Sequence, residues 1–383
     1  MNHAGARNCR GDRRRDNFPS VRLGTCIALE LAVVAGAAGG VLLATSRGGD
    51  IAGAYVHGRE AAAATAAYPP APAVVPLERA ELAIAPRGHS AADSVFGAPD
   101  PDLLAPLAAT PVTRIKLNRG GSSLSLRIDF ASGARAAFKP VQIHPQSDPR
   151  REIAAYRIDR LLGVGHVPPA RSAEFAVDDL IAAADPAIRD HAASRIGDET
   201  IARDGKLRGE VSWWVPEIKR VRIGGRYVDE PEGEALWTEY LQAGAAMPGE
   251  LRPMLAQLAT VIVFDVVIDN SDRWSGNNTQ GSPDDRILYF MDNTLSFSLY
   301  TRGHAANLSR LHRIQVFPRG LIGRLRSLTA EAIAAALGGD DDLLGPLLTG
   351  PEIDAVLSRR DHILEYVDRL ILELGDDAVL ALP

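Results

Sequence analysis

Two carboxylates and an amide in the second half of the chain have the types and order needed to move a phosphoryl group. Asp272 is followed within one polar segment by Asn277, and Asp292 ends an apolar run at residues 287–291. One carboxylate can position a hydroxyl and accept its proton. A second carboxylate and an amide can hold Mg²⁺ through oxygen. Each residue alone is common in polar turns, so the prediction depends on further parts of such a site.

A lysine and a glutamate upstream supply those further parts. Lys139 ends a strand-like run, and Glu152 falls in the first turn of a predicted helix. In kinases such a lysine contacts the nucleotide phosphates and a helix glutamate holds it. Taken alone, the lysine also suits a strand end with its charge in water, and the glutamate suits a helix N-terminus. Together with Asp272, Asn277 and Asp292, in this order, they favour phosphoryl transfer from ATP.

A short glycine-rich segment has two open interpretations. Gly120, Gly121 and Ser122 could cover the phosphates, because backbone N–H groups approach oxygen closely where no side chain intervenes. The same residues also suit an ordinary hairpin turn. The sequence has neither a Walker lysine motif nor the Gly-x-Ser-x-Gly elbow of many hydrolases. Trp213-Trp214 suits the core or the wall of a nucleotide pocket.

The elements that would position Lys139 are predicted from hydrophobic periodicity. Strand-like runs occupy residues 112–118, 123–130 and 134–139. In the second run, apolar and polar residues alternate as in a half-buried strand. A helix is predicted at about 149–162, with apolar residues on one stripe and glycines after its end. More strands are predicted before residue 220.

The second half of the folded region reads as helical. Apolar residues recur at helical spacing from about residue 233 onward, and they lead into the segment that holds Asp272. The fold class is therefore α+β, with a β-rich N-lobe at about 110–220 and an α-helical C-lobe at about 221–383. The residues with chemical potential fall at the junction of the two lobes.

The N-terminal part suggests a membrane-tethered protein of 383 residues. A basic tail, 1–22, precedes an apolar run at 23–44 that is about long enough to span a bilayer. This order predicts a single-pass signal anchor with the C-terminal domain extracytoplasmic. A cleaved signal peptide, giving a secreted protein, and a cytoplasmic protein with a misassigned start are the alternatives. An Ala/Pro-rich linker is expected at 45–109. The net charge of -6 gives no reason to expect nucleic acid.

Several motifs resemble the four-jointed and Golgi casein kinase family of secretory-pathway atypical kinases. Phe138-Lys139-Pro140 and the blocks at 151–163 and 167–169 resemble its lysine and helix motifs. Residues 264–273 resemble its catalytic loop, and Met291-Asp292-Asn293 resembles its metal motif. The resemblance implies a bilobal protein-kinase-like fold. It also implies a kinase that transfers the γ-phosphoryl group of ATP to a hydroxyl of a protein or glycan.

The resemblance also implies roles for single residues. Lys139 would be the ATP lysine, and Glu152 its partner or an acid of a manganese site. Asp272 would be the catalytic aspartate and Asp292 the metal-binding aspartate. The cofactors would be ATP with Mg²⁺ or Mn²⁺, between which oxygen ligands do not choose.

Some positions depart from the family pattern. Trp274 stands where the family usually has histidine, and Thr294 where it usually has glycine. The family's disulfides are absent, since Cys9 and Cys26 both precede the predicted folded region. Asn277 is closer to the pattern of lipid kinases and HipA-type kinases. A lipid-kinase-like or HipA-like kinase and a catalytically inactive pseudokinase are therefore alternatives.

Overall fold

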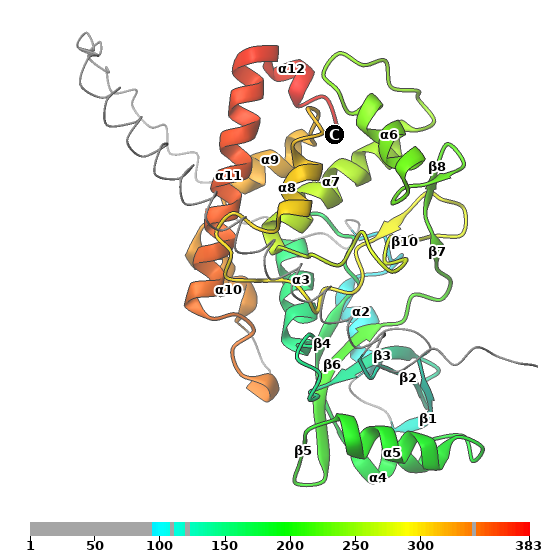
Figure 1. The fold of residues 1–383 in the computed structure, drawn as a ribbon. Coiled ribbons are helices and arrows are strands. Elements are labelled where there is room, and N and C mark those ends of the chain that lie inside the picture. Colours follow the sequence, from blue (N-terminus) through cyan, green and yellow to red (C-terminus); the bar gives the residue numbers. More distant parts are fainter. Residues whose placement is uncertain (1–93, 108–110, 119–122, 339–341) are drawn as a thin grey trace, which may run out of the picture. The chain divides into compact units, whose positions relative to one another are not determined.

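An antiparallel sheet forms the first half of the described fold (Figure 1). The computed structural model describes residues 94–107, 111–118, 123–338 and 342–383. These residues belong to one of the two units into which the chain divides, Ile84–Pro383. Within the described residues the main sheet has six strands, in the order β1-β2-β3-β6-β4, with β5 paired to β6. The strands are β1 Val112–Leu117, β2 Leu126–Phe130, β3 Arg135–Pro140, β4 Ala170–Ala176, β5 Ala202–Arg203 and β6 Lys206–Trp213.

The two faces of this sheet have different partners. On β2 and β3, the alternate residues Leu126, Ile128, Ala136 and Phe138 are buried in a core shared with α4, Val177–Ala182, and α5, Arg189–Glu199. Successive strand residues point to opposite faces. Lys139, which follows Phe138, is therefore directed to the other face. That face packs against helix α3, Pro149–Leu161.

Helix α3 begins at a strong start signal and connects the two halves of the fold. Asp148 caps it by accepting a hydrogen bond from the backbone N–H of Arg150 at 3.1 Å, and Pro149 occupies the first turn. Its buried residues, such as Ile153 and Ile158, belong to the core of the helical half, although the helix also contacts β4 and β6. Helix α3 therefore fixes Glu152 between the sheet and the helical half.

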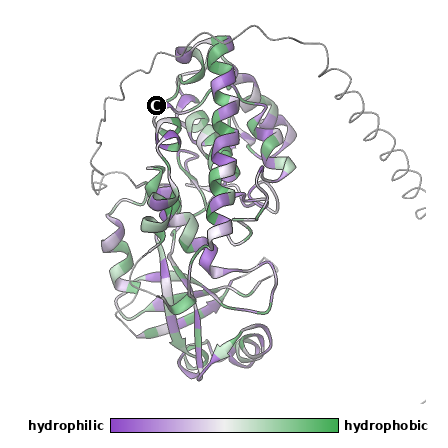
Figure 2. Cartoon of the chain, turned by 90° about the vertical axis from the view of Figure 1, so that its left-hand side faces the viewer, coloured by the Kyte–Doolittle hydropathy of each residue, from purple (hydrophilic) through white to green (hydrophobic). Residues whose placement is uncertain are grey.

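The helical half is centred on α7, Arg252–Ile268, whose last residues are buried on every side. It contacts α8 and the long α11, Gly350–Leu374, which ends beside α12 (Figure 1). Helix α11 mixes hydrophilic and hydrophobic residues, as a helix with one solvent face does (Figure 2). The other elements are β7 Lys219–Arg220, β8 Arg222–Ile223, β9 Arg226–Tyr227, α6 Pro231–Tyr240, β10 Gln280–Gly281, β11 Leu288–Tyr289, α8 Ala305–Leu311, α9 Arg319–Arg326, α10 Ala330–Leu337, η2 Asp342–Leu344 and α12 Asp376–Val379. The predicted α+β order, β-rich and then helical, is confirmed.

The folded region begins earlier than the sequence suggested. Residues 94–107 were expected to belong to a linker, but they form α2, Asp100–Leu104, and η1, Ala105–Leu107. Phe96 is 8 % exposed and packs against Trp213 and Tyr289, with ring centroids 5.6 and 5.7 Å apart. The expected boundary at residue 110 was wrong because these few apolar residues lie in an Ala/Pro-rich context that lacks a periodic pattern.

Two predictions lie outside the described residues. They are the membrane segment at 23–44 and the phosphate-covering segment Gly120, Gly121 and Ser122. Among the residues that the structure does describe, no helix is both long and apolar enough to cross a membrane.

Candidate active site

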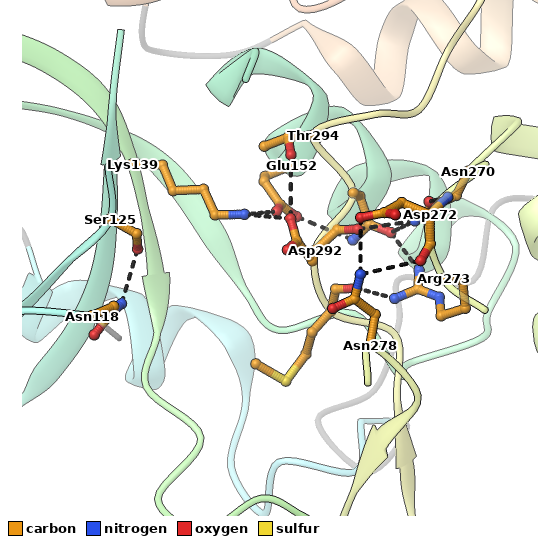
Figure 3. Close-up of polar contacts among 12 residues, drawn as sticks. Asn118, Ser125, Lys139, Glu152, Asn270, Asp272, Arg273, Asn278, Asp292 and Thr294 are labelled. Carbon is orange, nitrogen blue, oxygen red and sulfur yellow. Dashed lines mark hydrogen bonds and ion pairs between the residues drawn. The ribbon is translucent and has the colours of Figure 1, made fainter. Parts of the chain in front are cut away.

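Three of the predicted residues meet at the junction of the sheet and the helical half (Figure 3). The Nζ atom of Lys139 donates hydrogen bonds to Oε1 of Glu152 and to Oδ1 of Asp292, both at 2.7 Å. Lys139 comes from β3, Glu152 from the first turn of α3, and Asp292 from the segment after β11. Residues far apart in the sequence are thus brought into one charged cluster.

The electrostatics of this cluster are set by burial and by opposite charge. Burial disfavours the charged form of Lys139, but the carboxylates of Glu152, Asp292 and Glu210 outweigh it and raise the pKa of Lys139. The charge of Lys139 in turn lowers the pKa of Asp292. The ammonium group and the Asp292 carboxylate are therefore both charged over the physiological pH range.

Asn270 joins the segment that holds Asp272 to the segment that holds Asp292. Its side-chain amide donates to the backbone carbonyl of Asp292 at 3.0 Å and to Oδ1 of Asn293 at 3.1 Å. Its own Oδ1 accepts from the backbone N–H of Asp272 at 3.0 Å. Asn270 is fully buried, so these bonds are shielded from water. The relative position of the two aspartates is therefore fixed by the fold.

Arg273 also links the segments that hold Asp272 and Asp292, from the protein interior. It is completely buried and donates to the backbone carbonyl of Met291 and, at 2.6 Å, to Oδ1 of Asn293. Its charge is compensated by Asp265 of α7, with Nε 3.3 Å from Oδ1. The arginine of the predicted catalytic loop thus has a structural role, because its guanidinium group faces the protein interior.

Asp272 is held by its own loop. One carboxylate oxygen accepts from the Ser275 hydroxyl, and Oδ2 accepts from Nδ2 of Asn278 at 2.9 Å. Asp272 is half-buried and is not part of the cavity wall, to which its hydrogen-bond partner Asn278 contributes. Asn277, the amide chosen from the sequence, is exposed, has a φ of 68°, and is absent from the cavity wall. The neighbouring amide, Asn278, contributes to the cavity wall instead.

The cluster opens into a cavity of ≈ 510 Å³. Lys139, Glu152, Asp292 and Asn278 supply polar groups to its wall. The apolar part of the wall includes Ala137, Val167, Pro168, Trp213, Trp214, Val215, Ile218 and Met291. A cavity with apolar walls and a few polar groups is typical of a small-molecule site. The Trp213-Trp214 pair therefore lines the cavity, and Trp213 also packs on Phe96.

One further acid, which belongs to none of the predicted motifs, lies near the cluster. Glu210 of β6 is 1 % exposed. Burial and then the negative charge of Glu152 raise the pKa of Glu210 to about 8, partly offset by Lys139. Ser212 favours the charged form, but neither carboxyl oxygen of Glu210 has a partner with hydrogen-bond geometry. The alternation of apolar and polar residues along β6 could have predicted which face of the sheet Glu210 occupies. It could not have predicted that Glu210 pairs with Lys139 of β3.

The chain is similar to known kinases in both sequence and fold, although no family model matches it. It is 25 % identical to human glycosaminoglycan xylosylkinase over 314 residues, which are 72 % of this chain and 76 % of the relative. A crystal structure of the Golgi casein kinase matches with a TM-score of 0.59 at 16 % identity, covering 73 % of this chain and 77 % of that chain.

Two further solved structures agree with that fold. The Golgi casein kinase with Mn/ADP bound has a TM-score of 0.58 at 17 % identity, covering 73 % of this chain and 78 % of that one. Hydra Fam20 with sugar has a TM-score of 0.52 at 18 % identity, covering 72 % and 90 %. The predicted bilobal kinase-like fold is confirmed. The chain is similar to glycosaminoglycan xylosylkinase and the Golgi casein kinase, so the predicted family resemblance is confirmed as well.

Proposed function

We propose that this chain transfers the γ-phosphoryl group of ATP to a hydroxyl group of a protein or a glycan, with Mg²⁺ or Mn²⁺ as the metal. The observation that carries the proposal is the contact of Lys139 with both Glu152 and Asp292 at the wall of the cavity. The relatives support it, because one is named a xylosylkinase, another a casein kinase, and one structure contains Mn and ADP.

The cavity divides into parts that suit the two ends of a nucleotide. A base needs apolar surface above and below its ring, which Val167, Trp214 and Met291 can supply. Phosphates need a cation, and Lys139 reaches into the same cavity with its charge intact. We therefore assign Lys139 to the phosphates and the tryptophan side of the cavity to the base.

The residues present fit a metal ion shared with phosphates better than a metal ion held by protein alone. Asp292, Glu152 and Asn278 supply oxygen atoms to the cavity wall. In the part of the chain that the structure describes, no three His, Cys, Asp or Glu side chains converge on one metal position. Mg²⁺ is commonly bound by one or two carboxylates and substrate phosphates. When bound, the ion neutralises charge that develops on the transferred group.

We assign the acceptor hydroxyl to Asp272. Its carboxylate is oriented by Ser275 and Asn278, and its backbone is tied through Asn270 to the Asp292 segment. A base must lie within hydrogen-bonding reach of the proton that it takes. Asp272 would orient the hydroxyl toward the γ-phosphate and accept its proton late in the transfer.

The full chain incubated with labelled ATP, Mg²⁺ or Mn²⁺, and separate protein and sugar acceptors tests the proposal. Label should appear on one acceptor class in a metal-dependent manner, and Asp272→Asn should abolish it. Asp377→Asn, which removes the same charge from a fully exposed side chain, is a control for net charge. Transfer that is equal for the parent and Asp272→Asn would refute the assigned base. No transfer with any acceptor and no nucleotide binding would refute the kinase function.

We also propose that residues 23–44 tether the enzyme, with the C-terminal domain extracytoplasmic. The arginines that precede this apolar run support that orientation. Protease on the cytoplasmic side of sealed vesicles should leave the C-terminal domain intact. Digestion of that domain from the cytoplasmic side only would contradict the topology.

A further inference from the structure

Glu210 lies behind the ATP lysine on the neighbouring strand. In the antiparallel pairing of β3 with β6, Lys139 is directly opposite Glu210. Residues directly opposite in such a pair extend from the same face of the sheet. On β6, the neighbours Leu207 and Val211 belong to the core on the α4 and α5 side. Glu210 is therefore directed, with Lys139, to the face that α3 covers.

The charge of Lys139 only partly offsets the burial of the Glu210 carboxyl group. Glu210 is 1 % exposed, both of its carboxyl oxygens lack a hydrogen-bond partner, and it forms no ion pair. A buried polar group without a partner destabilises the fold and calls for an explanation. Among the described residues, Lys139 is the cation whose charge acts on Glu210, while Glu152 and Asp292 repel it.

The two carboxylates that bond to Lys139 in this structure, Glu152 and Asp292, also border the cavity where a metal–nucleotide complex would bind. Asp292 has a side chain that is 46 % exposed, and it lines the cavity. It is the residue that our proposed function assigns to the metal. Glu152 is 10 % exposed and also borders the cavity. A divalent cation near these carboxylates competes with the ammonium group for them and repels it. Lys139 would then need a negative charge on its other side.

We propose that Glu210 is a positioning residue for Lys139, which keeps the ammonium group in place when a metal–nucleotide complex draws Asp292 away. The inference rests on the proposed function, since it assumes that Lys139 serves a nucleotide. Glu210 touches neither phosphate nor acceptor. It acts through Lys139, and its buried position keeps it from binding the metal itself. A glutamate that only fills space would show no coupling to Asp292.

The metal-free chain provides the first test, a double-mutant cycle of Glu210→Gln with Asp292→Asn read by thermal unfolding. Above pH 8, where Glu210 is ionised, Glu210→Gln alone should raise the midpoint of unfolding, because it replaces a buried carboxylate, repelled by Glu152 and Asp292, with a neutral side chain of nearly the same shape. In the Asp292→Asn background that gain should shrink or reverse, because Glu210 is then a partner of Lys139. An equal shift in both backgrounds would overturn the proposal. A Glu210→Gln chain that fails to fold would also overturn it, since the role would then be structural.

Nucleotide binding provides the second test, with metal–ADP as the probe. Glu210→Gln should weaken binding and raise KM for ATP by about tenfold to a hundredfold, the cost of losing one hydrogen bond to a charged group. Glu210→Asp, which keeps the charge, should recover part of the loss. Glu174→Gln removes an equal charge from a solvent-facing ion pair with Lys206 and Arg208, and should bind like the parent.

The outcomes separate this inference from the proposed function. Binding by Glu210→Gln that equals that of the parent would overturn the role of Glu210 and leave the kinase function intact. Equal losses of nucleotide affinity in Glu210→Gln and Glu174→Gln would indicate a general effect of net charge. That result would also overturn the proposed role of Glu210. A parent chain that binds no metal–nucleotide would refute the proposed function, and this role with it.

Discussion

Replacing Lys139 by methionine should destabilise the folded chain even without nucleotide. The change removes the cation that compensates Glu152, whose side chain is 10 % exposed, and that acts on the buried Glu210. The lost contact with Asp292 contributes little to the expected loss of stability, because the Asp292 side chain is 46 % exposed and water screens its charge. Removing one partner of a buried pair costs about 3–5 kcal/mol. Because Lys139 itself is 15 % exposed, we expect a loss of about 2–4 kcal/mol at pH 7.

The sign of the pH dependence follows from Glu210, whose pKa is raised to about 8 by burial and by the charge of Glu152, partly offset by Lys139. Without Lys139 that offset is lost, so the folded-state pKa of Glu210 should rise further above its unfolded value. A carboxyl group with a raised folded-state pKa costs stability as pH rises from its unfolded to its folded pKa. The deficit of Lys139→Met should therefore be larger at pH 9 than at pH 7.

Urea unfolding of the parent, Lys139→Met and Lys139→Met/Glu152→Gln at the two pH values measures this effect. The second substitution removes the charge of Glu152 and should recover most of the lost free energy at pH 7. A Lys139→Met chain as stable as the parent at pH 7 would refute the reasoning. A deficit that Glu152→Gln leaves unchanged would show that lost packing of the lysine stem, rather than charge, is responsible.

Three further predictions test other parts of the account. Asn278→Ala should lower turnover by at least tenfold and Asn277→Ala should leave it unchanged, because of these two amides only Asn278 bonds to Asp272 and lines the cavity. Equal steady-state rates for the two variants would contradict this. Burial lowers the pKa of His166 to about 4, so on acidification the unfolded state binds a proton at a higher pH than the folded state does. Between pH 7.5 and pH 4.5 the parent should therefore lose up to about 3 kcal/mol more free energy of unfolding than His166→Phe does. Equal losses in the two proteins would refute this prediction. Phe96→Ala should lower the free energy of unfolding in urea by about 3 kcal/mol, since the buried ring packs on Trp213 and Tyr289. An unchanged free energy of unfolding would indicate that residues 94–107 are a linker, as the sequence predicted.

The cluster could be predicted because its residues carry a signal in their type and order. Lys139 ends an apolar strand, Glu152 follows a Pro-containing helix start, and Asp292 ends an apolar run. Local rules place each on a definite element. That they meet at 2.7 Å is a consequence of how α3 packs between the sheet and the helical half, which periodicity does not give.

The remaining site residues depended on backbone geometry that the sequence does not express. Asn277 and Asn278 are identical in type, and only the positive φ at Asn277 decides which amide faces the cavity. Glu210 lies opposite Lys139 because β6 pairs with β3, although β4 and β5 separate them in the chain. Phe96 is buried by tertiary contacts with Trp213 and Tyr289 that no local pattern announces.

The central claim, that the junction cluster transfers a phosphoryl group from ATP, is tested most directly by single-turnover transfer with Asp272→Asn beside the parent. The parent should transfer label to an acceptor in the presence of metal. Asp272→Asn should bind metal–nucleotide with unchanged affinity but transfer it about 10²–10⁴ times more slowly, because only the positioned base is lost. Unchanged transfer by the variant, or loss of nucleotide binding together with transfer, would contradict the account.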